Sequence, residues 1–68
     1  MHIGEEIKKE LKNQDKTVVW FAEQLAYSRI NVYRLFNKAY IDTQTLFRVS
    51  IILNYDFFAL FSQKLKER

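Results

Sequence analysis

Apolar residues recur at helical spacing along most of this 68-residue chain, and no stretch shows the strict alternation of a half-buried strand. The first repeat is the clearest, because Ile3, Ile7 and Leu11 follow one another at intervals of four with polar residues between them. The chain has no proline and a single glycine, so few positions interrupt a helix. The pattern predicts an all-α fold.

Polar turn residues divide the pattern into five short helices. The first ends before a loop at 13–16, the second covers about 17–25, and the third covers about 28–37. A loop at 37–41 precedes the fourth, which ends at Asn54 because asparagine tolerates a left-handed backbone. N-caps are expected at Thr17, Ser28, Asp42 or Thr43, and Asp56. The chain is too short for a second core, so residues 1–68 are predicted to form one domain.

Aromatic residues at helical spacing in a small helical protein indicate core packing more often than a ligand pocket. This interpretation applies to Trp20, Phe21, Phe47, Phe57, Phe58 and Phe61. The last helix differs, because its apolar residues surround much of its circumference and cannot all face one core. An exposed apolar face often marks an interface. We therefore expect a homodimer with Phe58, Phe61 and Leu65 in its interface.

The charge of the chain is uneven. Net charge is only +3, but Arg29, Arg34 and Lys38 fall in the segment from Gln24 to Ile41, which carries no acid. Such a basic patch suits the phosphates of a nucleic acid. Charge alone leaves a second interpretation open, in which the three cations are ordinary solvated side chains.

The third helix has two chemically different faces when its residues are placed at about 100° intervals. Val32, Leu35 and Phe36 fall on one side, toward the core. The opposite side, including its flank and first turn, carries Arg29, Ile30, Asn31, Tyr33, Arg34 and Asn37. Arginine can pair with guanine, asparagine with adenine, and an apolar group can touch a thymine methyl. Two alternatives stay open, namely that Ile30 is a core residue and that Tyr33 is an ordinary surface tyrosine.

The segment Phe21–Leu35, F-A-E-Q-L-A-Y-S-R-I-N-V-Y-R-L, resembles the helix-turn-helix of the phage-repressor/Cro family, also called the XRE type. Ala22, Ser28 and Val32 match that family's small, capping and β-branched positions. The segment Thr45–Phe61 looks like the family's fourth helix, and I-G-E-E-I-K-K-E-L resembles its opening helix. The similarity covers nearly the whole chain and implies a small five-helix fold of the lambda-repressor type.

The resemblance also implies a function. The chain would be a sequence-specific transcriptional regulator that inserts its third helix into the major groove of double-stranded DNA, as a homodimer. Base contacts would come from Arg29, Ile30, Asn31, Tyr33 and Arg34. Contacts to the DNA backbone would come from Thr17, Ser28, Asn37, Lys38 and Tyr40.

Three positions depart from the family pattern. Ala26 stands where the family often has glycine, and a positive φ there would cost about 1 kcal/mol. Phe36 replaces a common glutamate. Val18, Val19 and Trp20 replace residues that are often polar and near the DNA backbone. These three apolar residues favour an alternative function, a protein-interaction module such as an antitoxin or accessory subunit that binds its partner through them.

Other function classes lack the residues they need. The chain has no cysteine, and its only histidine, His2, lies at the terminus. No glycine-rich loop could hold a nucleotide phosphate, so no enzyme activity, metal or cofactor is expected. The longest apolar runs are five residues, far below the ~20 that a membrane-spanning helix requires. Glu5, Glu6 and Glu10 are atypical of a signal peptide, so we expect a cytoplasmic protein.

Overall fold

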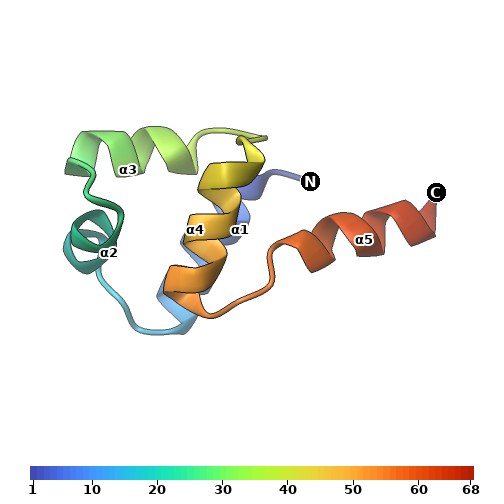
Figure 1. The fold of residues 1–68 in the computed structure, drawn as a ribbon, viewed down its shortest axis with the longest axis horizontal. Helices are drawn as coiled ribbons and strands as arrows, with labels where there is room; N and C mark the ends of the chain where they lie inside the picture. Colours follow the sequence, from blue (N-terminus) through green and yellow to red (C-terminus); the bar gives the residue numbers. More distant parts are fainter.

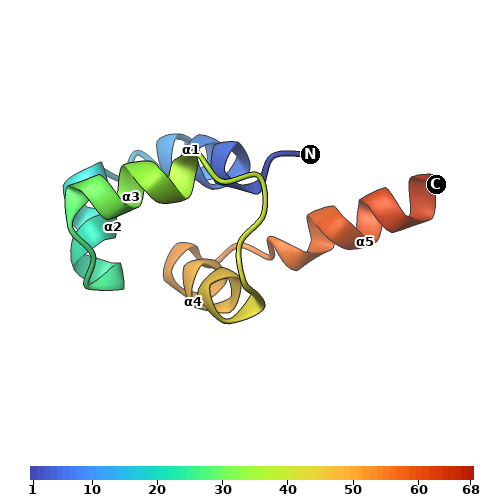
Figure 2. The ribbon, with the colours of Figure 1, turned by 90° about the horizontal axis from the view of Figure 1, so that it is seen from above.

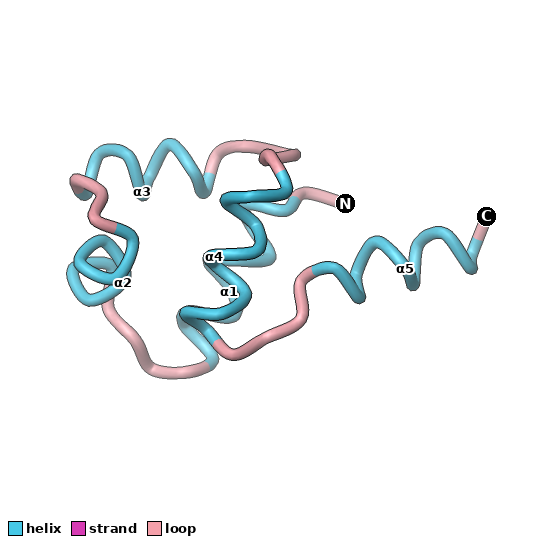
Figure 3. The backbone as a smooth tube through the Cα atoms, viewed as in Figure 1, coloured by secondary structure: helices cyan, strands magenta, loops and turns pink.

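The computed structural model describes all 68 residues and contains five helices and no strand, as the sequence predicts (Figure 1; Figure 3). The helices are α1 (Ile3–Asn13), α2 (Val18–Leu25), α3 (Arg29–Phe36), α4 (Thr43–Leu53) and α5 (Phe58–Glu67). Their bounds agree with the sequence prediction to within about one residue. The all-α class is therefore confirmed.

Helices α1 to α4 form one body, in which α3 and α4 each pack against both α1 and α2. Helix α5 extends away from this body in two perpendicular views (Figure 1; Figure 2), and none of its residues is buried. The molecule is accordingly elongated, with extents of 36 × 20 × 18 Å. No single helix is both long and apolar enough to cross a membrane; α4 and α5 together reach that length and composition, with a bend of 114° between them.

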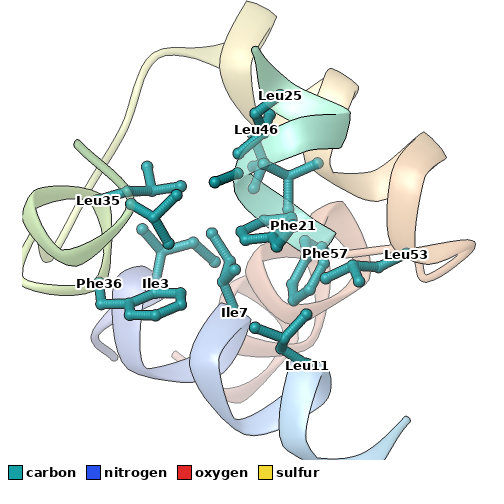
Figure 4. Close-up of a cluster of buried hydrophobic side chains, with 13 residues drawn as sticks. Ile3, Ile7, Leu11, Phe21, Leu25, Leu35, Phe36, Leu46, Leu53 and Phe57 are labelled. Carbon is teal, nitrogen blue, oxygen red and sulfur yellow. The ribbon is translucent and has the colours of Figure 1, made fainter. Parts of the chain in front are cut away.

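The core consists of 13 buried apolar side chains drawn from all of the first four helices and from the turn before α5 (Figure 4). Ile3, Ile7 and Leu11 are buried as their spacing predicts. The rings of Phe21 and Phe36 stack with centroids 6.3 Å apart and so join α2 to the end of α3. Phe57 is fully buried and anchors the chain where it leaves the body.

The starts of α2 to α5 carry the capping residues that the sequence predicts, whereas α1 is capped by His2, whose Nδ1 accepts from the amide of Glu5 at 3.1 Å. Thr17 accepts a hydrogen bond from the amide of Trp20 at 3.0 Å, and Ser28 accepts one from the amide of Asn31 at 3.2 Å. Asp42, not Thr43, caps α4. Asp56 accepts from the amide of Ala59 at 3.2 Å, although the cap position of α5 belongs to the next residue, Phe57. Each bond satisfies an amide that has no partner within its helix.

Three helices end in a residue with left-handed backbone, namely Asp15 (φ 56°), Ala26 (φ 58°) and Asn54 (φ 49°). In each case the next amide donates to the carbonyl five residues earlier, as Tyr27 does to Ala22 at 2.9 Å. This pattern is the Schellman motif. Aspartate and asparagine tolerate the conformation, whereas alanine is strained in it.

The structure corrects the core expectation for one of the six aromatic residues. Phe47 is 59% exposed, whereas Phe21 and Phe57 are buried and Trp20, Phe58 and Phe61 are half-buried against the edge of the core. Phe47 is exposed because the departure of α5 leaves one side of α4 uncovered. Helix α4 turns Leu46, Val49 and Leu53 to the core and exposes Phe47 and Ile51.

Candidate nucleic-acid interface

Helix α3 is held at its C-terminal end by the first turn of α1. The amides of Ile3 and Gly4 donate to the carbonyls of Ala39 and Lys38, at 2.8 and 2.9 Å. Gly4 also sits against the last carbonyls of α3, where a side chain would meet the oxygens of Leu35 and Phe36. This close approach requires glycine, and it fixes how α3 lies on the body.

The two faces of α3 are segregated as the sequence predicts. Val32, Leu35 and Phe36 are buried, and the opposite face is exposed along its whole length. Ile30 is 64% exposed, which excludes the alternative that it is a core residue. Tyr33 is also exposed, and its ring lies edge-on to Phe36 at 6.3 Å. The face therefore presents a continuous surface formed by Arg29, Ile30, Asn31, Tyr33 and Arg34.

A cleft of about 380 Å³ lies between α3 and the start of α4. It brings together three of the predicted contact residues, Asn31, Arg34 and Lys38. The other seven predicted contact residues do not line it, namely Thr17, Ser28, Arg29, Ile30, Tyr33, Asn37 and Tyr40. Sequence reasoning missed the cleft and three of its residues, Tyr27, Asp42 and Thr45. The only sequence signal was the Asp42 cap placed four residues after Lys38, and it gave no indication that the loop folds back beside α3.

Asp42 gives this cleft a fixed negative charge beside its two cations. The hydrogen bonds that Asp42 accepts from the amide and hydroxyl of Thr45, at 2.9 and 2.7 Å, hold its pKa below the ordinary value of 3.8. The nearby charge of Lys38 lowers that pKa further. The carboxylate is thus ionised at neutral pH and is held toward α4 by Thr45, in the same cleft as Arg34 and Lys38, whereas Arg29 lies outside this cleft.

The predicted backbone contacts are spread around the ends of helices. Thr17 and Ser28 use a hydroxyl lone pair to cap α2 and α3, and a hydroxyl retains a proton that it can donate to another oxygen. Asn37 and Lys38 are exposed at the end of α3, and Tyr40 is exposed in the loop that follows. No hydrogen bond within the chain involves the side chain of Asn37, Lys38 or Tyr40.

The apolar first turn of α2 is mostly used by the protein itself. Val18 and Trp20 are half-buried against the core, and the ammonium of Lys16 lies 4.8 Å from the centre of the Trp20 ring. Only Val19, at 43% exposed, faces solvent substantially. Of the three residues predicted to bind a protein partner, only Val19 therefore offers substantial exposed apolar surface.

The remaining predicted sites lie away from α3. Phe58 and Phe61 are half-buried on α5, and Leu65 is 62% exposed on its outer half. No group of three or more histidine or acidic side chains is placed to hold a metal ion.

The chain matches no protein-family model, no curated protein and no solved structure with which it was compared. The function of the α3 surface therefore has to be inferred from its own side chains. It offers two guanidinium groups, one amide and two apolar or aromatic side chains on a rigid helix, with one more cation at its end.

Proposed function

We propose that this chain is a sequence-specific DNA-binding regulator of transcription, with α2 and α3 as its helix-turn-helix and α3 as the recognition helix. The observation that carries the proposal is the outer face of α3. Five side chains able to contact base edges lie side by side there, all exposed, on a helix held to the body by a buried face. The lambda-repressor-like arrangement of the five helices is part of this proposal.

The dimensions of α3 suit the major groove. An α-helix with its side chains is about 10–12 Å across, and the groove is about 12 Å wide, so the eight-residue α3 can lie in it. Arg34 and Asn31 have the planar donor and acceptor groups that read guanine and adenine, and Ile30 has the apolar group that reads a thymine methyl. Arg29 and Tyr33, four residues apart on one side of the helix, would contact bases along that side.

Contacts to phosphates would fix the register of α3 on the duplex without reading the sequence. We assign this role to Thr17, Ser28, Asn37, Lys38 and Tyr40. A homodimer formed through Phe58, Phe61 and Leu65 would place two copies of α3 in successive turns of the groove, about 34 Å apart. The proposal includes a cytoplasmic location and no catalytic step, metal or cofactor.

The alternative is a protein-interaction module on the same scaffold, an antitoxin or accessory subunit with little DNA binding. One observation favours it, namely the exposure of Phe47 and Ile51 on α4, which adds to the small apolar surface at Val19. The two functions differ in which face matters. DNA binding depends on α3, whereas partner binding would depend on α4 or on the start of α2.

Selection from random duplexes, followed by fluorescence titration at several salt concentrations, tests the proposal. A preferred sequence should emerge, and its affinity should fall steeply with salt because each phosphate contact releases counterions. Arg34→Ala should weaken binding to the selected site by about 1–3 kcal/mol and relax preference at one base position. No binding at low salt would refute DNA recognition and leave the interaction module.

A second pair of variants separates phosphate contacts from base contacts. Lys38→Ala should weaken binding to all sequences and reduce the slope of log affinity against log salt by about one per bound chain. Lys8→Ala is the matched control, because Lys8 is an exposed lysine on α1. Equal effects of the two lysine variants would show that binding follows overall charge and not this surface.

A further inference from the structure

The cleft between α3 and the start of α4, here the α3–α4 cleft, combines three features that attract anions. Arg34 and Lys38 both line it from α3. No hydrogen bond within the chain involves the side chain of either residue, so their donors are not used by the protein itself. The amino end of α4 also opens onto the cleft, because Thr45 lines it, and this is the positive end of that helix. A phosphate in the cleft would therefore meet positive charge from two helices.

Asp42 is the one acid among the eight residues that line this cleft. Both of its carboxylate oxygens accept from Thr45, one from the amide at 2.9 Å and the other from the hydroxyl at 2.7 Å. These bonds lower the pKa of Asp42 most, and the charge of Lys38 adds to the effect, so the charges of Asp42 and Lys38 lie within range of each other. A phosphate bound to Lys38 would come within the same range.

We propose that Asp42 is a selectivity residue, which repels DNA phosphates from the α3–α4 cleft and so leaves Arg34 free to contact a base. This inference rests on the proposed function, because it takes α3 as the recognition helix. It adds an acid to a surface for which only neutral and basic contacts were expected. A phosphate in the cleft would engage Arg34 and Lys38 together in any duplex, since the backbone is the same in every sequence.

The repulsion should act more strongly on the wrong duplex than on the right one. In the specific complex Arg34 contacts a base, and only Lys38 holds a phosphate at the edge of the cleft. In a complex without base contacts both cations are free to bind phosphate, and the cleft that both of them line is where one phosphate can meet them together. Asp42 would then lower affinity for every duplex but lower it more for non-specific DNA. That ratio, and not affinity alone, governs which sites are occupied.

Capping does not by itself account for the charge of Asp42. Thr17 and Ser28 cap α2 and α3 with neutral hydroxyls, and asparagine caps a helix about as well as aspartate. Asp42→Asn therefore keeps a capping oxygen and removes only the charge. Asp56→Asn is the matched control, because Asp56 is also an exposed acid that accepts from a helix amide, that of Ala59 at 3.2 Å, but it lies before α5.

A titration with inorganic phosphate, without DNA, is the first test. Amide shifts of Lys38 and Thr45, followed by NMR, report phosphate in the cleft. Asp42→Asn should bind phosphate roughly two- to fivefold more tightly than the wild type, the size expected for one unit charge about 4–8 Å away in water. Asp56→Asn should match the wild type. Equal affinities of Asp42→Asn and the wild type for phosphate would overturn the inference, whatever the protein does with DNA.

The second test compares the selected duplex with a random duplex by fluorescence titration at low salt, where charges are screened least. Asp42→Asn should raise affinity for the random duplex by roughly two- to fivefold and affinity for the selected duplex by less, so the ratio falls. The slope of log affinity against log salt should steepen by about one for the random duplex, because one more phosphate is bound. Arg34→Ala in the Asp42→Asn background should remove the gain, because a phosphate in the cleft needs both cations.

Failure of this inference is distinguishable from failure of the proposed function. If the wild type selects a sequence but Asp42→Asn leaves the ratio unchanged, the selectivity role is refuted and DNA recognition stands. The same conclusion follows if Asp56→Asn lowers the ratio equally, or if the gain persists without Arg34. If the wild type binds no duplex at low salt, both fail. Circular dichroism checks that each variant stays helical.

Discussion

Replacing Ala26 by glycine should stabilise this protein, because Ala26 closes α2 in the left-handed conformation. Its φ and ψ are 58° and 38°, and the amide of Tyr27 completes the motif by donating to Ala22. For an L-residue the Cβ atom is too close to a carbonyl oxygen in this conformation. Glycine has no Cβ and adopts it without strain.

The expected gain is the difference between two opposing effects. Relief of the left-handed strain is worth roughly 1–2 kcal/mol. Glycine also makes the unfolded chain more flexible, which costs about 0.4–1 kcal/mol. Ala26 is exposed, so its methyl group contributes no core packing that would be lost. The net stabilisation should be about 0.5–1 kcal/mol, which for a domain of this size raises the melting temperature by about 2–8 °C.

Urea unfolding followed by Trp20 fluorescence and by circular dichroism measures this change directly, since Trp20 is the only tryptophan. The midpoint should rise while the slope m stays constant, because m reports the surface exposed on unfolding. The orientation of α3 should stay unchanged, because glycine keeps the same turn between α2 and α3.

Ala39→Gly provides the matched control. Ala39 is also an exposed alanine in a loop, but its φ is not positive, so glycine brings only the entropic cost there. The control should therefore lose about 0.4–1 kcal/mol. A stability of Ala26→Gly equal to that of Ala39→Gly would mean that Ala26 is not strained, and the argument from its backbone conformation would fail.

Two further predictions concern the ends of α3 and α4. Gly4→Ala should destabilise the protein by about 1–3 kcal/mol, since its Cβ would lie within 2.5 Å of the Leu35 carbonyl oxygen. Glu5→Ala is the control at an exposed position, and it should change the free energy of unfolding, measured in urea, by less than about 0.5 kcal/mol. Asp42 has a folded-state pKa below its unfolded value of 3.8, so its contribution is complete above that pH and is lost as pH falls through the folded pKa. Asp42→Asn keeps the capping oxygen and cannot titrate, so its stability, measured by urea unfolding at a series of pH values, should fall less below about pH 4 than that of the wild type.

The elements of this fold were predictable because short-range interactions define them. A cap joins residues three apart, as Thr17 does with Trp20, and a buried helix face repeats every three or four residues, as Ile3, Ile7 and Leu11 do. Both signals lie within one or two helical turns, so they can be read from the sequence. The exposed face of α3 followed from the same periodicity.

The surroundings of α3 were not predictable in the same way. The cleft beside it exists because the loop after Asn37 returns along the helix and brings Asp42 near Lys38. That path depends on hydrogen bonds that the backbone amides of Ile3 and Gly4 donate to carbonyls more than thirty residues away in the sequence. No local pattern records such pairings, so the acid next to the basic patch was missed.

The exposure of Phe47 and Ile51 has a different origin, and it bears on function. Helix α4 has two apolar faces, one with Leu46 and Val49 and one with Phe47 and Ile51. Helical spacing predicts that each face is buried, but it does not identify the element that each face packs against. Helices α1 and α2 cover the face of Leu46 and Val49, and α5 is the only remaining element that could cover the other. Helix α5 leaves the body instead, so Phe47 and Ile51 stay exposed. Helix α3 lies on the opposite side of the body from α5 in Figure 1, so the surface proposed for DNA is separate from the surface of α5. Under the proposed function, glutamate at Ile30 should weaken DNA binding; under the alternative function, glutamate at Ile51 should weaken partner binding instead.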